Sequence, residues 1–345
     1  MSAANQAKAQ FAAELNRIAP ARPVVTYALI ALCFAVFVLE LIKGAGFDSM
    51  PIPLAIQLGA DYGPLTISGQ WWRLLTAMFL HFGFFHIAMN MWCLFALGFL
   101  AERLMGRLGF LVLYFGAGLA GSLLSVAINP QVVGAGASGG VFGVAGGLVT
   151  YLWLKKAPLD FAGVKRQLQS LATFIGINVL YSLQANVDMM AHLGGLVAGL
   201  AIGAALPPFL LGAATAIPMP MHERSSNSKR VATVGIGCLI ALFAGIVAVK
   251  HFQGDTAYVW NSYEQIRAGH SADVIPTLEA IVKRKPDSGI AHFALGAAYL
   301  RTNRAEEAVR ELERAVQIDP TDKDFRKQLN DAYLATGQVG KIIGN

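Results

Sequence analysis

Long apolar runs constrain this chain more than any other feature of its sequence. Seven stretches of roughly 20 residues carry almost no charge; they cover residues 24–42, 84–101, 110–128, 137–154, 170–187, 190–211 and 231–249. A backbone in hydrocarbon must satisfy its own hydrogen bonds, so these stretches favour membrane-spanning helices. Only 14% of the residues are charged, against about 25% in soluble proteins. The sequence therefore predicts an all-α, polytopic membrane protein.

Positive charge is concentrated on one side of the apolar part. The net charge is +6, and residues 251–345 hold 12 Lys and Arg against 13 Asp and Glu, so the excess belongs to residues 1–250. Its basic residues gather at 8–22, 103–107, 155–166 and 224–230, which share one side if seven spans alternate. Positive segments favour the cytoplasm. This predicts a cytoplasmic N-terminus and an extracytoplasmic C-terminal part. The expected location is the inner (cell) membrane of a bacterium. Because the charge is a topology signal, no nucleic-acid partner is expected.

The chain is predicted to be organised in five consecutive segments. They are a cytoplasmic N-terminal segment (1–23), a six-helix core (24–211), a cytoplasmic linker (212–230), a seventh transmembrane helix (231–250) and a C-terminal helical repeat domain (255–345). The three cysteines, Cys33, Cys93 and Cys238, lie far apart in apolar stretches. They are expected to be small buried side chains rather than disulfides or metal ligands.

The C-terminal part contains a helical repeat. In residues 289–322, small, apolar and proline positions match a helix–turn–helix unit of about 34 residues; they are Leu295, Gly296, Tyr299, Ala308, Leu312, Ala315 and Pro320. This segment resembles a tetratricopeptide repeat. The 34 residues before this segment match the repeat pattern more loosely. The residues after it match only the first helix of the pattern. We therefore expect two repeats and a capping helix that bind a protein or peptide partner; the alternative is an ordinary helical hairpin domain.

A serine opens the fourth apolar stretch, in the run Gly136-Ala137-Ser138-Gly139. Flanking glycines leave the Ser138 hydroxyl exposed and let other backbone approach, which suits a nucleophile. However, a serine in a membrane helix more often bonds to its own helix or packs as a small residue. The run alone does not decide between these roles.

A histidine, His192, opens the sixth apolar stretch, next to Gly195. An ionisable side chain at membrane depth is costly, so it indicates either a functional site or a bond to a neighbouring span. The alternating topology puts His192 and Ser138 near the same outer face. Glycines at four-residue spacing, which allow close helix packing, follow both residues: Gly139, Gly143 and Gly147 in one stretch, Gly195, Gly199 and Gly203 in the other. If these stripes meet, His192 can take the Ser138 proton during attack on a carbonyl.

Hydrogen-bond donors lie at the start of the second apolar stretch. His86 and Asn90 are four residues apart and share a helix face. Both can donate to a developing oxyanion, and one such donor is worth roughly 3–4 kcal/mol. His81, His86 and His192 form an alternative zinc set, but no acidic residue stands beside them and the spacing is not HExxH. We therefore expect neither a metal nor another cofactor.

In order and spacing, these motifs resemble the rhomboid family of intramembrane serine proteases. The resemblance covers residues 24–211 and rests on Trp72-Arg73, His81 with His86 and Asn90, Gly136-Ala137-Ser138-Gly139, and Ala191-His192 with Gly195. It implies a catalytic dyad of Ser138 and His192 without an acid. It implies an oxyanion hole formed by His86, Asn90 and the Ser138 amide.

The resemblance also assigns supporting positions. These are the external-loop pair Trp72 and Arg73, the small residues Gly136, Gly139, Gly195 and Gly199, and Phe142. Phe142 stands where some members of the family have a tyrosine, so it can stack on the imidazole but supplies no hydroxyl. The pair Glu102-Arg103 resembles an acidic-basic pair of the family and is taken as structural.

The sequence predicts an endopeptidase that cleaves single-span membrane proteins in the lipid bilayer near its outer face. The alternative is a non-catalytic, rhomboid-like protein that binds and escorts membrane clients. A transporter is disfavoured because no internal inverted repeat is visible. Asp188, one helical turn before His192, is expected to be structural or solvated rather than a third catalytic residue.

Overall fold

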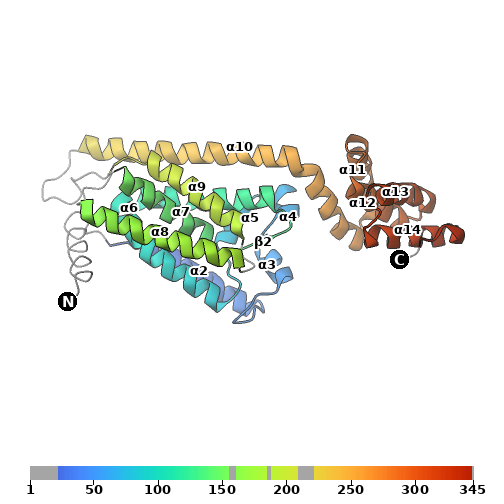
Figure 1. The fold of residues 1–345 in the computed structure, drawn as a ribbon, viewed down its shortest axis with the longest axis horizontal. Coiled ribbons are helices and arrows are strands. Elements are labelled where there is room, and N and C mark those ends of the chain that lie inside the picture. Colours follow the sequence, from blue (N-terminus) through green and yellow to red (C-terminus); the bar gives the residue numbers. More distant parts are fainter. Residues whose placement is uncertain (1–21, 155–160, 185–187, 209–220, 344–345) are drawn as a thin grey trace. The chain divides into compact units, whose positions relative to one another are not determined.

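The computed structural model describes residues 22–154, 161–184, 188–208 and 221–343, which are almost entirely helical (Figure 1). The predicted fold class, an all-α membrane protein with a helical repeat region, is confirmed. Within the described residues, the strands are two short antiparallel pieces, β1 (Asp61–Tyr62) and β2 (Val133–Gly134). The chain forms two compact units that divide between Ala248 and Val249.

Six long helices build the first unit. They are α2 (Val24–Ile42), α6 (Phe84–Ile128), α7 (Ser138–Trp153), α8 (Phe161–Gln184), α9 (Met189–Ala205) and the first part of α10 (Met221–Arg267). Three described helices are long and apolar enough to cross a membrane, within Val24–Ile42, Phe84–Ile128 and Asn227–Arg267, and Met189–Ala205 is a shorter apolar helix. The chain is an integral membrane protein.

Two predicted spans are joined in α6. The helix contains both 84–101 and 110–128, and Gly106 between them has a φ of 74° that interrupts the helical geometry. Glycine adopts a positive φ at little cost, because it has no Cβ. α6 therefore consists of two helices that meet at a kink at Gly106.

Some predicted segments lie partly outside the described residues. These parts are 1–21 of the N-terminal segment, 155–160 and 185–187 of the six-helix core, 209–220, where the core was predicted to end and the linker to begin, and 344–345 of the repeat domain. Residues 221–230, predicted as linker, form the start of α10. This helix continues without interruption through the seventh apolar stretch.

Close approaches between helices hold the first unit together. α7, α9 and the second half of α6 pack on one another, and large apolar side chains fill the space beside them: Phe110, Leu113, Tyr114, Val144 and Leu148. α10 packs on α6, where Cys238 lies beside Gly116 and Gly235 lies beside Val112. Glu102 accepts hydrogen bonds from the backbone amides of Val25 and Thr26 at 3.0 and 2.8 Å. It thereby satisfies donors that the start of α2 leaves free.

Residues 43–83 form a folded loop of short helices. They are α3 (Ile52–Leu58), α4 (Gly63–Ile67), α5 (Arg73–Thr76) and the 3-10 turn η1 (Ala77–Phe79). The buried Arg73 guanidinium donates to the carbonyls of Ile56 and Ala60 at 2.7 and 2.9 Å, and it lies 4.7 Å from the centroid of the Trp72 ring. The two residues of the predicted loop motif therefore brace this loop.

The second unit is a stack of helices after Val249. The end of α10 is followed by α11 (Ser271–Arg284), α12 (Gly289–Arg301), α13 (Ala305–Ile318), α14 (Lys323–Ala335) and the short η3 (Val339–Lys341). The Tyr299 hydroxyl donates to Glu279 at 2.6 Å, and 34 residues later Tyr333 donates to Glu313 at 2.9 Å. The same bond recurs at the period of the sequence repeat, so successive helix pairs use one packing arrangement.

Candidate active site

Ser138 and His192 come together in the first unit. Ser138 is the first residue of α7, and His192 lies in the first turn of α9. Nε2 of His192 is 2.7 Å from Oγ of Ser138, and His192 is only 6% exposed. A short bond between a hydroxyl and an imidazole, enclosed by helices, is the arrangement that activates a serine nucleophile.

Glycine contacts bring these two residues together. A Cβ on Gly195 would collide with the carbonyl oxygen of Gly139. The same clash would recur one and two helical turns along, between Gly199 and Gly143 and between Gly203 and Gly147. α7 and α9 therefore touch backbone to backbone, which small residues allow. This contact fixes the register in which Ser138 faces His192.

An aromatic ring holds the imidazole from one side. Phe142, one helical turn after Ser138, stacks on His192 with 4.3 Å between ring centroids and 18° between planes. Phe142 also lies 6.2 Å from Phe174 of α8. The stacked Phe142 ring restricts the rotation of the His192 side chain, as the sequence led us to expect. Phenylalanine offers no hydroxyl group to the site.

Gly136 shapes the turn before the serine. Its φ is 135°, and its amide donates to the carbonyl of Ala77 at 2.9 Å. A Cβ at this position would lie 3.0 Å from the ring of His86. Glycine is needed here both for the backbone conformation and for the space that the His86 ring occupies.

The protonation of His86 is set by a backbone donor. The amide N–H of Phe82 points at Nδ1 of His86, with a distance of 3.2 Å. Nδ1 must therefore accept, which leaves the proton of the neutral imidazole on Nε2. Nε2 lies at the edge of the ring that borders Gly136, two residues before Ser138. His86 thus presents a donor to the segment that carries the serine.

Asn90 lies on the same face of α6, one helical turn further along. Its amide Nδ2 donates to the carbonyl of His86 at 3.0 Å, and the residue is buried. One of its two amide hydrogens is therefore used within the helix. In this conformation Asn90 braces the turn that carries His86.

An acidic residue supports this side of the site and was not singled out from the sequence. Glu40, buried near the end of α2, accepts a hydrogen bond from the backbone amide of His81 at 3.0 Å. The ring of His81 is buried, donates through Nδ1 to the carbonyl of Phe79 at 3.1 Å, and lies 5.2 Å from the ring of His86. An acid inside an apolar span was the available signal, because such a group needs a partner.

The carboxyl group of Asp188 caps the helix that carries His192. It accepts from the amide of Ala191 at 3.0 Å and from the hydroxyl of Ser125 at 2.6 Å. Both bonds satisfy groups at the start of α9 or on its neighbour α6. Among the described residues, no three His, Cys, Asp or Glu side chains gather as a metal site would require.

Comparison with known proteins identifies two regions. Residues 68–209 match the model of the rhomboid domain, and residues 262–323 match that of a tetratricopeptide repeat. The chain is 30% identical over 318 residues to the rhomboid protease GluP of Bacillus subtilis, which covers 91% of this chain and 58% of that protein. This chain therefore spans somewhat more than half the length of that relative.

Two further relatives are covered over a larger share of their own length. The rhomboid-like protease 1 of Toxoplasma gondii is 31% identical over 223 residues, which is 60% of this chain and 69% of that protein. The rhomboid protease AarA of Providencia stuartii is 31% identical over 201 residues, which is 52% of this chain and 71% of that protein. With the helical membrane fold, these matches place the chain in the rhomboid family of intramembrane proteases, with a tetratricopeptide-repeat tail.

Proposed function

We propose that this protein is an intramembrane serine endopeptidase that cleaves single-span membrane proteins through a dyad of Ser138 and His192. The observation that carries the proposal is the 2.7 Å hydrogen bond between Ser138 Oγ and His192 Nε2. The buried stack of Phe142 on His192 supports it, since a catalytic imidazole needs a fixed orientation. Membership of the rhomboid family supports the same class of reaction.

The chemistry follows from the contacts of the dyad. His192 Nε2 takes the hydroxyl proton as Ser138 Oγ attacks the substrate carbonyl, and the protonated imidazole then gives that proton to the leaving amine. His86 Nε2–H lies beside the Gly136–Ser138 segment and is proposed as a donor to the oxyanion, a contribution of about 3–4 kcal/mol. Asn90 is proposed as a second donor after a small side-chain rotation. A water molecule, activated by the same imidazole, releases the acyl group.

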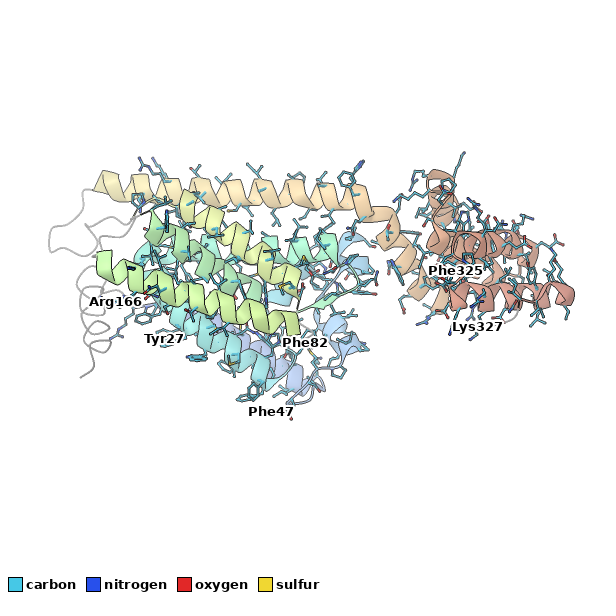
Figure 2. All side chains as sticks on the ribbon, in the orientation of Figure 1. Tyr27, Phe47, Phe82, Arg166, Phe325 and Lys327 are labelled. Carbon is cyan, nitrogen blue, oxygen red and sulfur yellow. The ribbon has the colours of Figure 1, made fainter. Side chains whose placement is uncertain are left out.

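The expected place of cleavage is the extracytoplasmic side of the bacterial inner membrane. Tyr27, at the start of α2, and Arg166, near the start of α8, lie toward one end of the first unit, whereas Phe47 and Phe82 lie toward the other (Figure 2). The basic residues favour a cytoplasmic position for the first of these ends. Ser138 and His192 lie in the first turns of α7 and α9, and the segment before Ser138 bonds to the 43–83 loop, which contains Phe47 and Phe82. The repeat tail is proposed to lie on that side.

Replacement of the nucleophile tests the proposal. Ser138→Ala should lower cleavage of a single-span membrane substrate in detergent on the order of a thousandfold or more, and it should abolish labelling by a fluorophosphonate probe. Ser170→Ala, a matched change at an exposed serine of α8, should leave both unchanged. Undiminished cleavage by the Ser138→Ala variant would disprove the proposed catalytic role of Ser138 and His192. Folded wild-type protein that neither cleaves nor reacts would favour the non-catalytic alternative, a rhomboid-like escort protein.

The repeat tail is proposed to bind a protein or peptide partner and to recruit substrates. Its helices follow one 34-residue packing arrangement, and repeats of this type present extended binding surfaces. Deletion of residues 255–345 should weaken cleavage of a full-length natural substrate and leave cleavage of a short model substrate intact. Equal loss of both, or of neither, would contradict the recruitment role.

A further inference from the structure

A buried carboxyl group lies in the loop that faces the start of α9. Asp61 of β1 is only 3% exposed, and its backbone pairs with Gly134 of β2. Its Oδ1 accepts a hydrogen bond from the hydroxyl of Thr66 at 2.6 Å, while Oδ2 is buried without a hydrogen-bond partner in the described structure. A buried oxygen without a donor disfavours the ionised form of the acid.

The carboxyl group of Asp188 borders the same space from the other side. A Cβ built on Gly134 would lie 3.1 Å from Oδ2 of Asp188 and 3.6 Å from Cβ of Asp61. The two acids therefore flank one glycine, although they are 127 residues apart in the sequence. Asp61 is buried and Asp188 is partly buried, and the charge of Asp188 disfavours ionisation of Asp61.

Asp188 connects this pair to the dyad. Its Oδ1 accepts from the amide of Ala191, and its own carbonyl accepts from the amide of His192 at 3.3 Å. Its Oδ2 is held by Ser125 of α6. The first turn of α9, which sets the place of the His192 ring, is thus fixed through one residue.

We propose that Asp188 is a positioning residue for His192, and that the carboxyl group of Asp61 must carry a proton for Asp188 to hold the first turn of α9. The inference rests on the proposed protease function. When Asp61 loses its proton, the new charge repels Asp188 across Gly134. The least costly response is a movement of the Asp188 carboxylate away from β1, which loosens its bond to Ala191 and displaces His192 from Ser138.

Burial, modified by neighbouring groups, places the loss of the Asp61 proton near neutral pH. Burial raises the pKa of Asp61 from 3.8 to about 7. The hydroxyl of Thr66 opposes this rise, the charge of Asp188 adds to it, and the guanidinium of Arg73 from α5 and the amide of Tyr62 oppose it. Arg73 is committed to the carbonyls of Ile56 and Ala60, so it stabilises the loop more directly than it neutralises Asp61.

The pH profile of cleavage gives the sharpest test. For the wild type, kcat should fall several-fold as the pH rises from about 6 to about 9, with little change in KM. Asp61→Asn, which cannot ionise, should remove that fall. Asp48→Asn, the same change at an exposed aspartate of the same loop, should retain it. A fall in Asp61→Asn identical to that of the wild type would overturn the proposal.

Thermal unfolding in detergent provides a readout that does not depend on catalysis. Because the pKa of Asp61 is higher in the folded protein than in the unfolded chain, its contribution to stability is lost as the pH rises from about 4 to about 7. The Tm of Asp61→Asn should therefore rise relative to that of the wild type across this window, and the difference should then stay constant at higher pH. A difference that does not vary with pH would contradict the buried-acid assignment, even if Ser138→Ala had already disproved the protease function.

Variants of Asp188 separate positioning from folding. Asp188→Asn keeps an oxygen that can accept from Ala191 and should retain most of kcat. Asp188→Ala should lower kcat at least tenfold at an unchanged KM. If Asp188→Ala lowered Tm but left kcat of the folded enzyme intact, the residue would be a structural cap only, and the positioning role would fail.

Discussion

The two units of this chain pack their helices in different ways. In the membrane unit, α7 and α9 meet at glycines, and the atom that a Cβ on Gly199 would strike is a backbone oxygen of Gly143. In the repeat tail, the corresponding contact is between Gly296 and the side chain of Leu312, and neighbouring helices are also linked by bonds such as that of Tyr299 to Glu279.

The solvent explains the difference. Lipid tails are as apolar as leucine, so helices in a bilayer gain little from burying large side chains against one another, and close backbone contact holds them together. The tail gains from removing apolar surface from water, at roughly 25 cal/mol per Å². The membrane unit should therefore tolerate added volume at its interfaces less well than the tail.

The largest expected effect follows from adding volume to the membrane interface. Gly199→Val should separate α7 from α9, because the backbone of Gly143 cannot move aside as a side chain can. We expect a loss of more than about 3 kcal/mol of stability and no measurable labelling of Ser138. Gly237→Val, in a helix where nothing lies within 4 Å of the new group, is the control for labelling and Tm. Full labelling of Ser138 in the Gly199→Val variant would contradict the expectation that the membrane unit tolerates added volume poorly.

The same substitution in the tail should have a smaller and local effect. A Cβ on Gly296 would lie 2.6 Å from Cγ of Leu312, a side chain that can partly adjust. Gly296→Val should destabilise the tail by about 1–3 kcal/mol while Ser138 labelling stays normal. Limited proteolysis of the tail measures the loss, and Gly340→Val, at an open position, provides the reference. Equal destabilisation of the membrane unit would contradict a local effect.

The next largest effect is expected from loss of the hydrogen bond between Glu40 and the amide of His81 in the membrane unit. Glu40→Ala leaves the buried amide of His81 without its acceptor, at a cost of about 1–3 kcal/mol. The loop that delivers the Phe82 amide to His86 should loosen, which lowers kcat more than it raises KM. Glu40→Gln keeps an acceptor and should recover most of kcat. A Glu40→Gln variant as impaired as Glu40→Ala would point to a need for the carboxyl group itself.

The smallest loss of stability is expected when a hydrogen bond to a half-exposed side chain of the tail is removed. Tyr299→Phe removes the hydroxyl that donates to Glu279, a residue whose side chain is 48% exposed. We expect a loss of about 0.5–1 kcal/mol from the tail, seen as a small drop in its Tm, and a similar loss for Tyr333→Phe one repeat later. A drop as large as that of Gly296→Val would show that polar bonds, rather than packing, dominate the tail.

Local patterns were enough to predict much of this molecule. Apolar runs set the helices, the 34-residue period predicted the repeats, and the glycine stripes pointed to the helix pair that carries Ser138 and His192. Contacts between distant positions were not visible in the same way. Neither the pairing of Asp61 with Gly134 nor the bond of Glu40 to His81 repeats at a local period, so no spacing rule indicates them.

Asp188 illustrates the boundary between what local sequence patterns predict and what only the folded structure shows. The sequence left it between a structural and a solvated role, because one helical turn from His192 is compatible with both. The folded chain brings Ser125 and Ala191 to its carboxyl group and places Asp61 across Gly134. The sequence by itself indicated the helices, their membrane setting and the serine and histidine of the proposed dyad, since these depend on local composition and period. Only the tertiary structure decided which carboxyl groups lie on either side of Gly134, because burial and charge proximity arise from segments that meet after folding.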